Sequence, residues 1–333
     1  MILPTDPTTV LVLLLAAFFC LASWANTYKM TSSWRFELYY FDYALGVLLI
    51  GVLSALTLGS MGDDLSFSDN LLIAGKRNMA YAIAAGAVFN FGNLLFMAAL
   101  SLAGMSLAFP AAYGTALVVV NLLRLFGPEG HGKTLLLGST MLALATILCI
   151  VGAARAFARP DGQPAKAGTT LKLVLLSVLA GIPLGLFQPL LKWARAPEIG
   201  LASYATVFFF SIGLFLSTLI YNLYFCNLPV EGRPVGLIDY FRSKLKFHVL
   251  GLMGGAIWCS GLLCSLVALE SPRGRDLWLS VQNIVLPSFP VAGALYGLVV
   301  WRELRDVRQS VRLLVLLALV CFLAAIFLSS QTL

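Results

Sequence analysis

Apolar runs of bilayer length recur ten times along these 333 residues. A helix needs about 20 consecutive apolar residues to cross the hydrocarbon core of a bilayer. Because lipid offers no hydrogen-bond partners, a spanning run must satisfy its own backbone groups as a helix. The sequence therefore predicts an all-α integral membrane protein with ten transmembrane helices, at roughly 8–26, 38–59, 79–101, 104–126, 133–153, 171–191, 200–223, 247–269, 277–300 and 311–329.

The composition excludes a soluble domain beside these spans. Hydrophobic residues make up 60% of the chain and charged residues 11%, whereas soluble proteins average about 25% charged. The longest polar gaps, 153–170 and 227–246, are too short to fold as a catalytic or regulatory domain. The first apolar run, Val10–Ala25, lacks a basic leader and a small-residue cleavage site, so we expect it to be retained as a helix.

The cysteines and the net charge fit a membrane protein without a metal or nucleic-acid partner. None of the six cysteines forms a Cys-x-x-Cys pair, and their placement in apolar segments favours packing over metal or redox chemistry. The net charge of +7 comes from Lys and Arg in short loops, where they set orientation and contact anionic lipid. The cysteines are Cys20, Cys149, Cys226, Cys259, Cys264 and Cys321.

Most of the Lys and Arg residues lie in the first, third, fifth, seventh and ninth loops. By the positive-inside rule these odd-numbered loops are cytoplasmic. Both termini are then predicted to lie outside.

Weak internal similarity divides the ten helices into two sets of five. Three sequence matches recur in order, separated by about 163 to 180 residues. Since each half has an odd number of helices, the second copy is predicted to be inverted, as in alternating-access carriers. We expect a first repeat at 1–153, a connecting loop at 154–170 and a second repeat at 171–333. The matches pair Trp24–Lys29 with Phe187–Lys192, Gly86–Asn90 with Gly254–Trp258, and Pro110 with Pro287 or Pro290.

The hairpin Gly104–Pro110, the tract Trp34–Gly46 and the lysines Lys29 and Lys192 that end two helices carry a family resemblance. With ten helices in two halves, the chain resembles the drug/metabolite transporter superfamily. Within it, the hairpin and the tract are most similar to bacterial relatives of ureide permeases and of glucose/rhamnose-type sugar transporters. The resemblance implies a secondary transporter in the bacterial inner (plasma) membrane, with a central cavity between the two halves.

Two asparagines in the third span are candidates for binding substrate. Asn90 and Asn93 are three residues apart, so they project from one face of a helix. Amides both donate and accept hydrogen bonds, which suits a sugar, a nucleobase or a ureide. Alternatively, the two side chains bridge neighbouring helices.

Polar residues beside prolines mark two further candidate positions. Gln188 lies between Pro183 and Pro189, which remove backbone hydrogen bonds and are expected to open the sixth helix. Broken helices expose polar groups to substrate in carriers. The alternative is a simple kink. Gln282 and Asn283, shortly before Pro287 and Pro290, repeat the arrangement in the ninth span.

Aromatic rings offer flat surfaces for a ring-shaped solute. Trp24, Trp258 and Tyr113, with Phe89 and Phe91, are the candidates. The competing interpretation is packing or interface anchoring, because the chain has 22 Phe, 11 Tyr and 6 Trp.

Charged residues at helix ends are candidates for gating or coupling. Lys29 and Lys192 either snorkel to the interface or close a gate by pairing with an acid, for which Glu37 and Asp42 are nearest to Lys29. Asp42 is also the candidate for proton coupling, with uniport or exchange left open. The same gating set includes the prolines Pro110, Pro183, Pro189 and Pro287.

The segment Gly127–Thr134 matches the phosphate-loop pattern but lacks its context. A nucleotide site needs a preceding strand, a following helix in water and a partner acid. We interpret the match as a tight turn with an interfacial lysine, Lys133. His131 and His248 have no metal-ligand spacing.

Taken together, the sequence predicts a secondary carrier that moves a small polar metabolite, of the nucleobase/ureide or sugar class, by alternating access. Alternatives are a multidrug or amphipathic-compound exporter of the same superfamily, or a membrane receptor or enzyme. The spans contain no cluster of His, Asp, Glu and Cys, so no enzyme and no cofactor are expected. Expected partners are the solute and membrane lipid, without nucleic acid. Pairs of glycines four apart, at Gly181/Gly185, Gly251/Gly255 and Gly293/Gly297, serve packing or a homodimer face.

Overall fold

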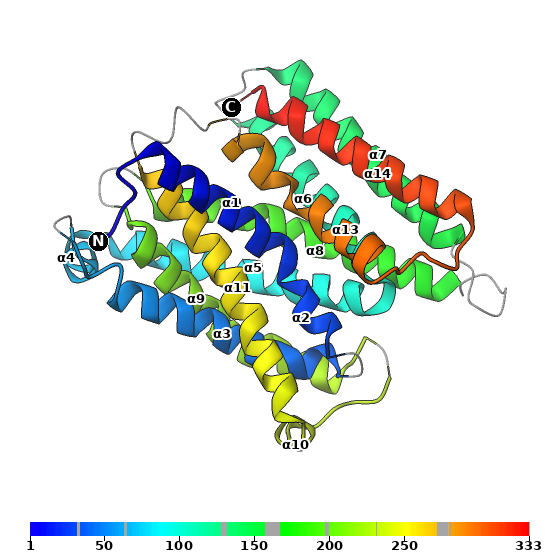
Figure 1. The fold of residues 1–333 in the computed structure, drawn as a ribbon, viewed down its shortest axis with the longest axis horizontal. Coiled ribbons are helices and arrows are strands. Elements are labelled where there is room, and N and C mark those ends of the chain that lie inside the picture. Colours follow the sequence, from blue (N-terminus) through cyan, green and yellow to red (C-terminus); the bar gives the residue numbers. More distant parts are fainter. Residues whose placement is uncertain are drawn as a thin grey trace. The chain divides into compact units, whose positions relative to one another are not determined.

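The chain folds into helices throughout the part that the computed structural model describes, residues 1–31, 34–62, 65–127, 132–156, 167–196, 200–230, 232–271, 279 and 281–332. Ten helical segments in it are long and apolar enough to cross a membrane, which confirms the predicted integral membrane fold. The elements, drawn in Figure 1, are α1 Pro7–Ser23, α2 Ala25–Lys29, α3 Phe36–Leu56, α4 Phe67–Ile73, α5 Lys76–Ala103, α6 Met105–Phe126, α7 Lys133–Ala156, α8 Ala167–Ala194, α9 Ser203–Asn227, α10 Leu237–Phe241, α11 Leu245–Glu270, η1 Val281–Val285, η2 Leu286–Ser288, α13 Phe289–Leu295, η3 Tyr296–Val300 and α14 Gln309–Ser330.

Two compact units make up the chain. The first contains Met1–Phe91 and Phe187–Gln282, and the second contains Gly92–Leu186 and Asn283–Leu333. Helices α5 and α8 therefore each contribute one part to each unit. The predicted division into an inverted first and second repeat is a different partition of the chain and stays a prediction.

Glycines let the helices of the first unit approach closely. A Cβ atom added at any of four glycines would collide with the backbone carbonyl of a neighbouring helix, so only glycine fits there. Two contacts join α3 to α11 and two join α5 to α9. They are Gly46 on Leu252 O, Gly255 on Tyr43 O, Gly213 on Ile83 O and Gly86 on Phe210 O.

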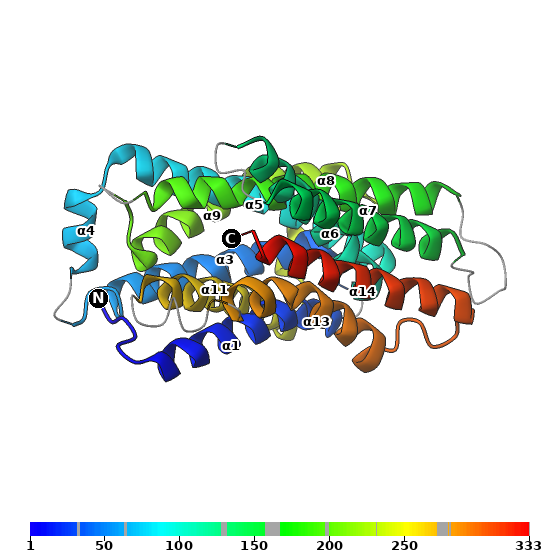
Figure 2. The ribbon, with the colours of Figure 1, turned by 90° about the horizontal axis from the view of Figure 1, so that it is seen from above.

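The second unit is built around the α7–α14 pair, whose helices lie side by side (Figure 2), with α6 against α7 and α13 against α6. A buried polar chain ties three of these helices. Asn121 of α6 donates to Ser139 Oγ at 2.8 Å, Ser139 donates to Ala325 O at 2.7 Å, and Ser329 of α14 donates to Asn121 Oδ1 at 2.9 Å. Each polar group thus finds a partner that lipid could not supply.

The paired glycines pack inside this chain. Gly181 and Gly185 of α8 face α6, where an added Cβ would meet Thr115 or Val119. Gly251 and Gly255 face α3, and Gly293 and Gly297 face α6. The homodimer prediction therefore gains nothing from these glycines.

The two proline-rich spans behave differently, and one expectation needs correction. Helix α8 is continuous from Ala167 to Ala194, so Pro183 and Pro189 do not open it as expected. A proline removes its own amide donor and crowds the carbonyl four residues earlier, and the bonds of the other residues keep α8 helical around both prolines. The ninth span, in contrast, changes from π-helix to 3-10 helix at Pro287 before α13 begins.

Candidate functional site

A cavity of about 930 Å³ opens in the first unit. Helix α8 contributes Gln188 and Lys192, and α11 ends in it at Glu270. Further polar residues of the lining are Asn70, Arg195 and Gln282. Helices α8 and α11 reach the cavity with their C-terminal ends. Apolar side chains such as Leu191, Leu266 and Leu269 form the rest of the wall.

Hydrogen bonds from side chains shape the wall of this cavity. Asn70 of α4 accepts from the Ala202 amide at 3.1 Å and donates to Gly200 O at 3.4 Å. Glu270 accepts from the amide of Ser203, the first residue of α9, at 2.9 Å. A carboxylate at a helix N-terminus satisfies an amide that has no partner within the helix. The loop from Gly200 to Ser203 is thereby fixed from two sides.

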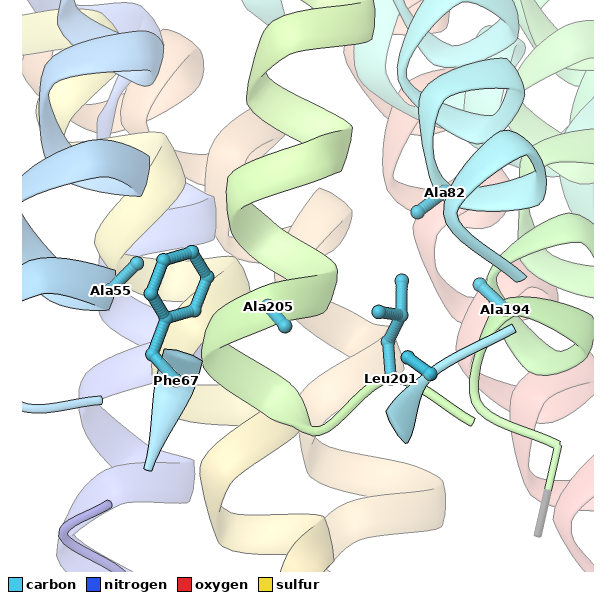
Figure 3. Packing of buried hydrophobic residues seen from close by; sticks show 7 residues of the cluster. Ala55, Phe67, Ala82, Ala194, Leu201 and Ala205 are labelled. Atoms are coloured by element: carbon cyan, nitrogen blue, oxygen red, sulfur yellow. The ribbon is translucent and has the colours of Figure 1, made fainter. Parts of the chain in front are cut away.

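Apolar packing also supports the loop from Gly200 to Ser203. Figure 3 shows Leu201 in a cluster with side chains from α3, α4, α5, α8 and α9. Phe67 of α4 stacks edge-on against Phe208 at a centroid distance of 5.1 Å. The short helix α4 therefore anchors the cavity wall. The cluster comprises Ala55, Phe67, Ala74, Ala82, Ala194, Leu201 and Ala205.

At the N-terminal ends of α3 and α11, an ion pair joins the buried Glu37 to the partly exposed Arg35. Glu37, which is 0% exposed, accepts from Arg35 Nη2 at 2.6 Å and from Arg35 Nε at 3.1 Å. The Glu37 carboxylate raises the pKa of Arg35. The carbonyl of Glu37 accepts from Asn222 of α9 at 2.6 Å, and Arg35 donates to Arg233 O at 3.0 Å. One residue pair thus connects α3, α9 and the segment before α10.

Asp42 is held beside this pair by α10 and α11. Tyr240 of α10 donates to Asp42 Oδ1 at 2.5 Å, and His248 Nδ1 lies 2.8 Å from Asp42 Oδ2. Burial, with Asp42 as a second cause, raises the pKa of Tyr240, so the phenol stays a donor. Trp34 stacks on Tyr240 and Phe247 and donates to Ser243 Oγ at 2.7 Å. We call Trp34, Asp42, Tyr240 and His248 the Asp42 cluster.

Aromatic side chains fill the middle of the first unit. Phe89 stacks on Trp258 at a centroid distance of 4.2 Å, and Phe187 and Phe210 surround them. Trp24 is buried and lies 5.1 Å from Tyr43, centroid to centroid. These rings pack on one another, which is the alternative that the sequence left open.

The two asparagines of α5 fall in different units. Asn90, in the first, is 0% exposed, donates to Ser217 Oγ at 2.7 Å and accepts from Thr218 Oγ1 at 3.2 Å. Both of its polar atoms are thus engaged by α9, as in the helix-bridging interpretation. Asn93 is buried in the second unit.

The second unit holds the other predicted residues. Tyr113 stacks on Phe109 and meets Phe289 edge-on at 4.9 Å between centroids. Pro110 is buried inside α6, Asn283 is half-buried, and Pro287 is exposed.

Sequence reasoning missed an acid that caps α6. Glu303 accepts from the amides of Met105 and Ser106 at 2.9 and 2.8 Å and from Ser106 Oγ at 2.7 Å. Gly104, at φ +79°, makes the turn that aims these amides. The only sequence signal for the contact was an acid in the ninth loop, almost 200 residues away.

Among the predicted residues, Gln188, Lys192 and Gln282 come together in the cavity. Glu37 pairs with Arg35 and Asp42 with His248, and the expectation that Lys29 either snorkels or closes a gate with an acid stays a prediction. Lys29 is half-buried at the end of α2. Missed residues are Arg195, Glu270 and Asn70 at the cavity, and Arg35, Tyr240 and His248 at the opposite end.

Two expectations from the sequence are that the phosphate-loop match between α6 and α7 is accidental and that the histidines hold no metal. Positions 128–131 of the phosphate-loop match, His131 included, lie outside the described residues. Gly127 follows α6 and Lys133 begins α7. Within the described part of the chain, no group of three His, Cys, Asp or Glu side chains could hold a metal ion.

Comparison with known proteins points to permeases. No family model matches the chain. Ureide permease 1 and Ureide permease 2 of Arabidopsis thaliana are each 22% identical over 86% of this chain and 87% of their own. Ureide permease 4 is 28% identical over 46% of this chain and 39% of its own. With the ten spans, these relatives support a multi-pass membrane transporter and confirm the expectation of a non-enzyme.

One solved structure supports the fold. A crystal structure described only as that of a protein matches with a TM-score of 0.51 and 18% identity, over 98% of this chain and 99% of that one. At this identity the match bears on the fold alone.

Proposed function

We propose that the chain is a secondary carrier for a small polar solute. The solute belongs to the ureide or nucleobase class, and a sugar is the second candidate. The observation that carries the proposal is the cavity of the first unit, whose wall includes the polar side chains of Gln188, Gln282, Lys192, Arg195 and Glu270. Its volume of about 930 Å³ is that of a small-molecule site. The names of the Arabidopsis relatives supply the solute class.

The lining favours a neutral or anionic solute over a cationic drug. Gln188 and Gln282 each offer two amide donors and an acceptor, which match the carbonyl and N–H groups of a ureide. Lys192 and Arg195 outnumber Glu270 among the described charged residues of the wall. An excess of positive charge repels cations. The multidrug alternative, which called for a larger apolar and aromatic cavity, is therefore the weaker one.

The close glycine contacts support an inverted repeat. Adding 167 to Gly46 and Tyr43 leads to Gly213 and Phe210, and subtracting 169 from Leu252 and Gly255 leads to Ile83 and Gly86. The contact of Gly46 on Leu252 O thus corresponds to that of Gly213 on Ile83 O. The contact of Gly255 on Tyr43 O corresponds to that of Gly86 on Phe210 O. Such an exchange of partners is what a two-fold relation between halves produces.

The two ends of the first unit support alternating access. One end holds the cavity, next to Met1 and α4. At the other end, the acids Glu37 and Asp42 are buried, each paired with a partly exposed residue, Arg35 and His248. A carrier in one of its two states is open at one end and closed at the other. With the odd loops cytoplasmic, the cavity would face outwards.

Binding to the purified protein tests the proposed solute class. We expect allantoin, as a ureide, to raise the melting temperature, and the cation tetraphenylphosphonium to leave it unchanged. Gln188→Ala and Gln282→Ala should each weaken allantoin binding by about 1 kcal/mol, roughly fivefold. Ser330→Ala, at a half-buried position in the second unit that is not part of the cavity lining, is the control. Undiminished allantoin binding in both glutamine variants would remove the cavity from the proposal.

The cellular location and the oligomeric state belong to the same proposal. We place the protein in a bacterial inner membrane because of the sequence resemblance, although the matched relatives are from a plant. Fractionation of the expressing cell tests the location, and light scattering in detergent tests the homodimer.

A further inference from the structure

The segment Arg233–Phe247, which we call the α10 corner, exposes large apolar side chains. Leu237, Ile238, Phe241 and Leu245 are 50%, 63%, 79% and 77% exposed. The corner follows the end of α9 at Asn227, includes α10 and ends in the first turn of α11, whose span begins at Leu245. Residues at such a boundary lie at headgroup depth, where apolar side chains can enter the acyl region.

Basic side chains surround these apolar ones. Arg233, Arg242, Lys244 and Lys246 are exposed, and Asp239 is the one acid among the described residues of the corner. The Asp239 carboxylate accepts from the Gly236 amide at 3.0 Å and so begins α10. Exposed apolar residues interleaved with lysine and arginine match an anionic bilayer surface in both hydrophobicity and charge.

The inner face of the corner touches the Asp42 cluster. Tyr240 lies between Phe241 and Asp239 in sequence, is only half-exposed, and donates to Asp42 Oδ1 at 2.5 Å. Ser243 accepts from Trp34 Nε1 at 2.7 Å. A ligand that fixes the position of the corner therefore also stabilises its hydrogen bonds to Asp42 and Trp34.

We propose that the α10 corner binds anionic phospholipid and that this docking holds Tyr240 against Asp42, so that acidic lipid stabilises the Asp42 cluster. The basic side chains bind headgroup phosphates, and Leu237, Ile238 and Phe241 enter the acyl boundary. An effect of acidic lipid on transport rests on the proposed function, whereas the binding and its coupling to Asp42 do not.

Hydrogen exchange of the protein in nanodiscs tests both parts without a transport assay. We expect phosphatidylglycerol, compared with phosphatidylcholine alone, to slow amide exchange in 237–247 by about fivefold, the effect of one basic residue near an anionic surface. Exchange in 36–42 should slow as well. Inorganic phosphate added to phosphatidylcholine discs should do neither, which separates a lipid headgroup from a free anion. Equal exchange in both lipids would overturn the proposal.

Matched variants separate the corner from the general positive charge of the protein. Lys244→Gln with Lys246→Gln should weaken the lipid effect, since Arg233 and Arg242 remain. Arg305→Gln with Arg308→Gln, which removes two exposed charges from the ninth loop, should leave it unchanged. If both double variants lose the lipid effect equally, the α10 corner is not a specific lipid site and the proposal is wrong. Protection that instead rises with protein concentration in detergent would assign the surface to a second copy of the chain and refute the lipid.

Tyr240→Phe tests the coupling. Without its hydroxyl, Tyr240 cannot donate to Asp42, but the basic and apolar residues of the corner remain. Phosphatidylglycerol should then still protect 237–247 and no longer protect 36–42. Protection of both segments in Tyr240→Phe would show that lipid docking does not reach Asp42 through this bond.

Discussion

Replacing Asn90 by Ala should lower stability and leave solute affinity unchanged. The side chain is fully buried, and its two polar atoms bond Ser217 and Thr218 of α9. The substitution removes both bonds and leaves two hydroxyls without this partner. Hydrogen bonds between membrane helices contribute about 0.6 kcal/mol on average and up to about 1.7. We therefore expect a loss of about 1–3 kcal/mol of stability.

The assay measures melting temperature and allantoin affinity on the same detergent-purified samples. Asn90→Ala should melt several degrees lower, at about 2–4 °C per kcal/mol, and bind as the unsubstituted protein does. Gln188→Ala should show the reverse, because Gln188 is exposed in the cavity. Adding Ser217→Ala to Asn90→Ala should cost less than the sum of the single changes, since one bond is shared. An unchanged melting temperature with weakened binding in Asn90→Ala would return this residue to the binding site.

Four further outcomes follow from contacts elsewhere in the chain. Glu303→Ala removes the acceptor of three hydrogen bonds at the start of α6 and should lower the free energy of unfolding by about 2–4 kcal/mol. The control Asp306→Ala, at an exposed position, should leave it almost unchanged, and equal melting temperatures of the two variants would contradict this expectation. Gly86→Ala and Gly255→Ala should destabilise the protein by similar amounts, about 1–3 kcal/mol each, whereas Gly236→Ala, where a Cβ has room, should leave stability unchanged. A large difference between Gly86→Ala and Gly255→Ala would argue against the inverted repeat. A reporter fused after Thr332 should lie outside the cytoplasm, and a cytoplasmic signal would reverse the orientation. Lys133→Ala should leave uptake into proteoliposomes intact without ATP, and loss of uptake in a folded variant would revive the phosphate-loop interpretation.

The spans could be predicted because lipid imposes one rule on every stretch of backbone. A run such as 311–329 must be helical to satisfy its own amides, so length and hydropathy suffice. Helical spacing also places Asn90 and Asn93 on one face of α5. It does not say what packs there, and the two residues belong to different units.

The polar contacts could not be predicted because their partners are far apart in sequence. Asp42 and His248 are separated by 206 residues, and Ser106 and Glu303 by 197. Neither pair has a spacing that marks it. Prolines illustrate the same limit, since α8 stays helical through Pro183 and Pro189 while the ninth span is interrupted at Pro287. The sequence signal is similar, so it does not tell which of the two spans is interrupted.

The exposure of each polar contact to water determines whether its hydrogen bonds can break during a conformational change. Asn90 lies deep in the first unit, where its bonds to α9 have no water to exchange with, so this part of the unit should move as a rigid body. Glu37 and Asp42 lie at a span end, where Arg35 and Tyr240 are partly exposed and water can replace each bond. Such an exchange costs about 0.5–1.5 kcal/mol per hydrogen bond. A few of these bonds amount to the 1–3 kcal/mol over which one ligand influences another site. If the chain works by the proposed alternating access, contacts of this strength can define a closed state and still let a solute in the cavity, or a lipid at the α10 corner, shift it.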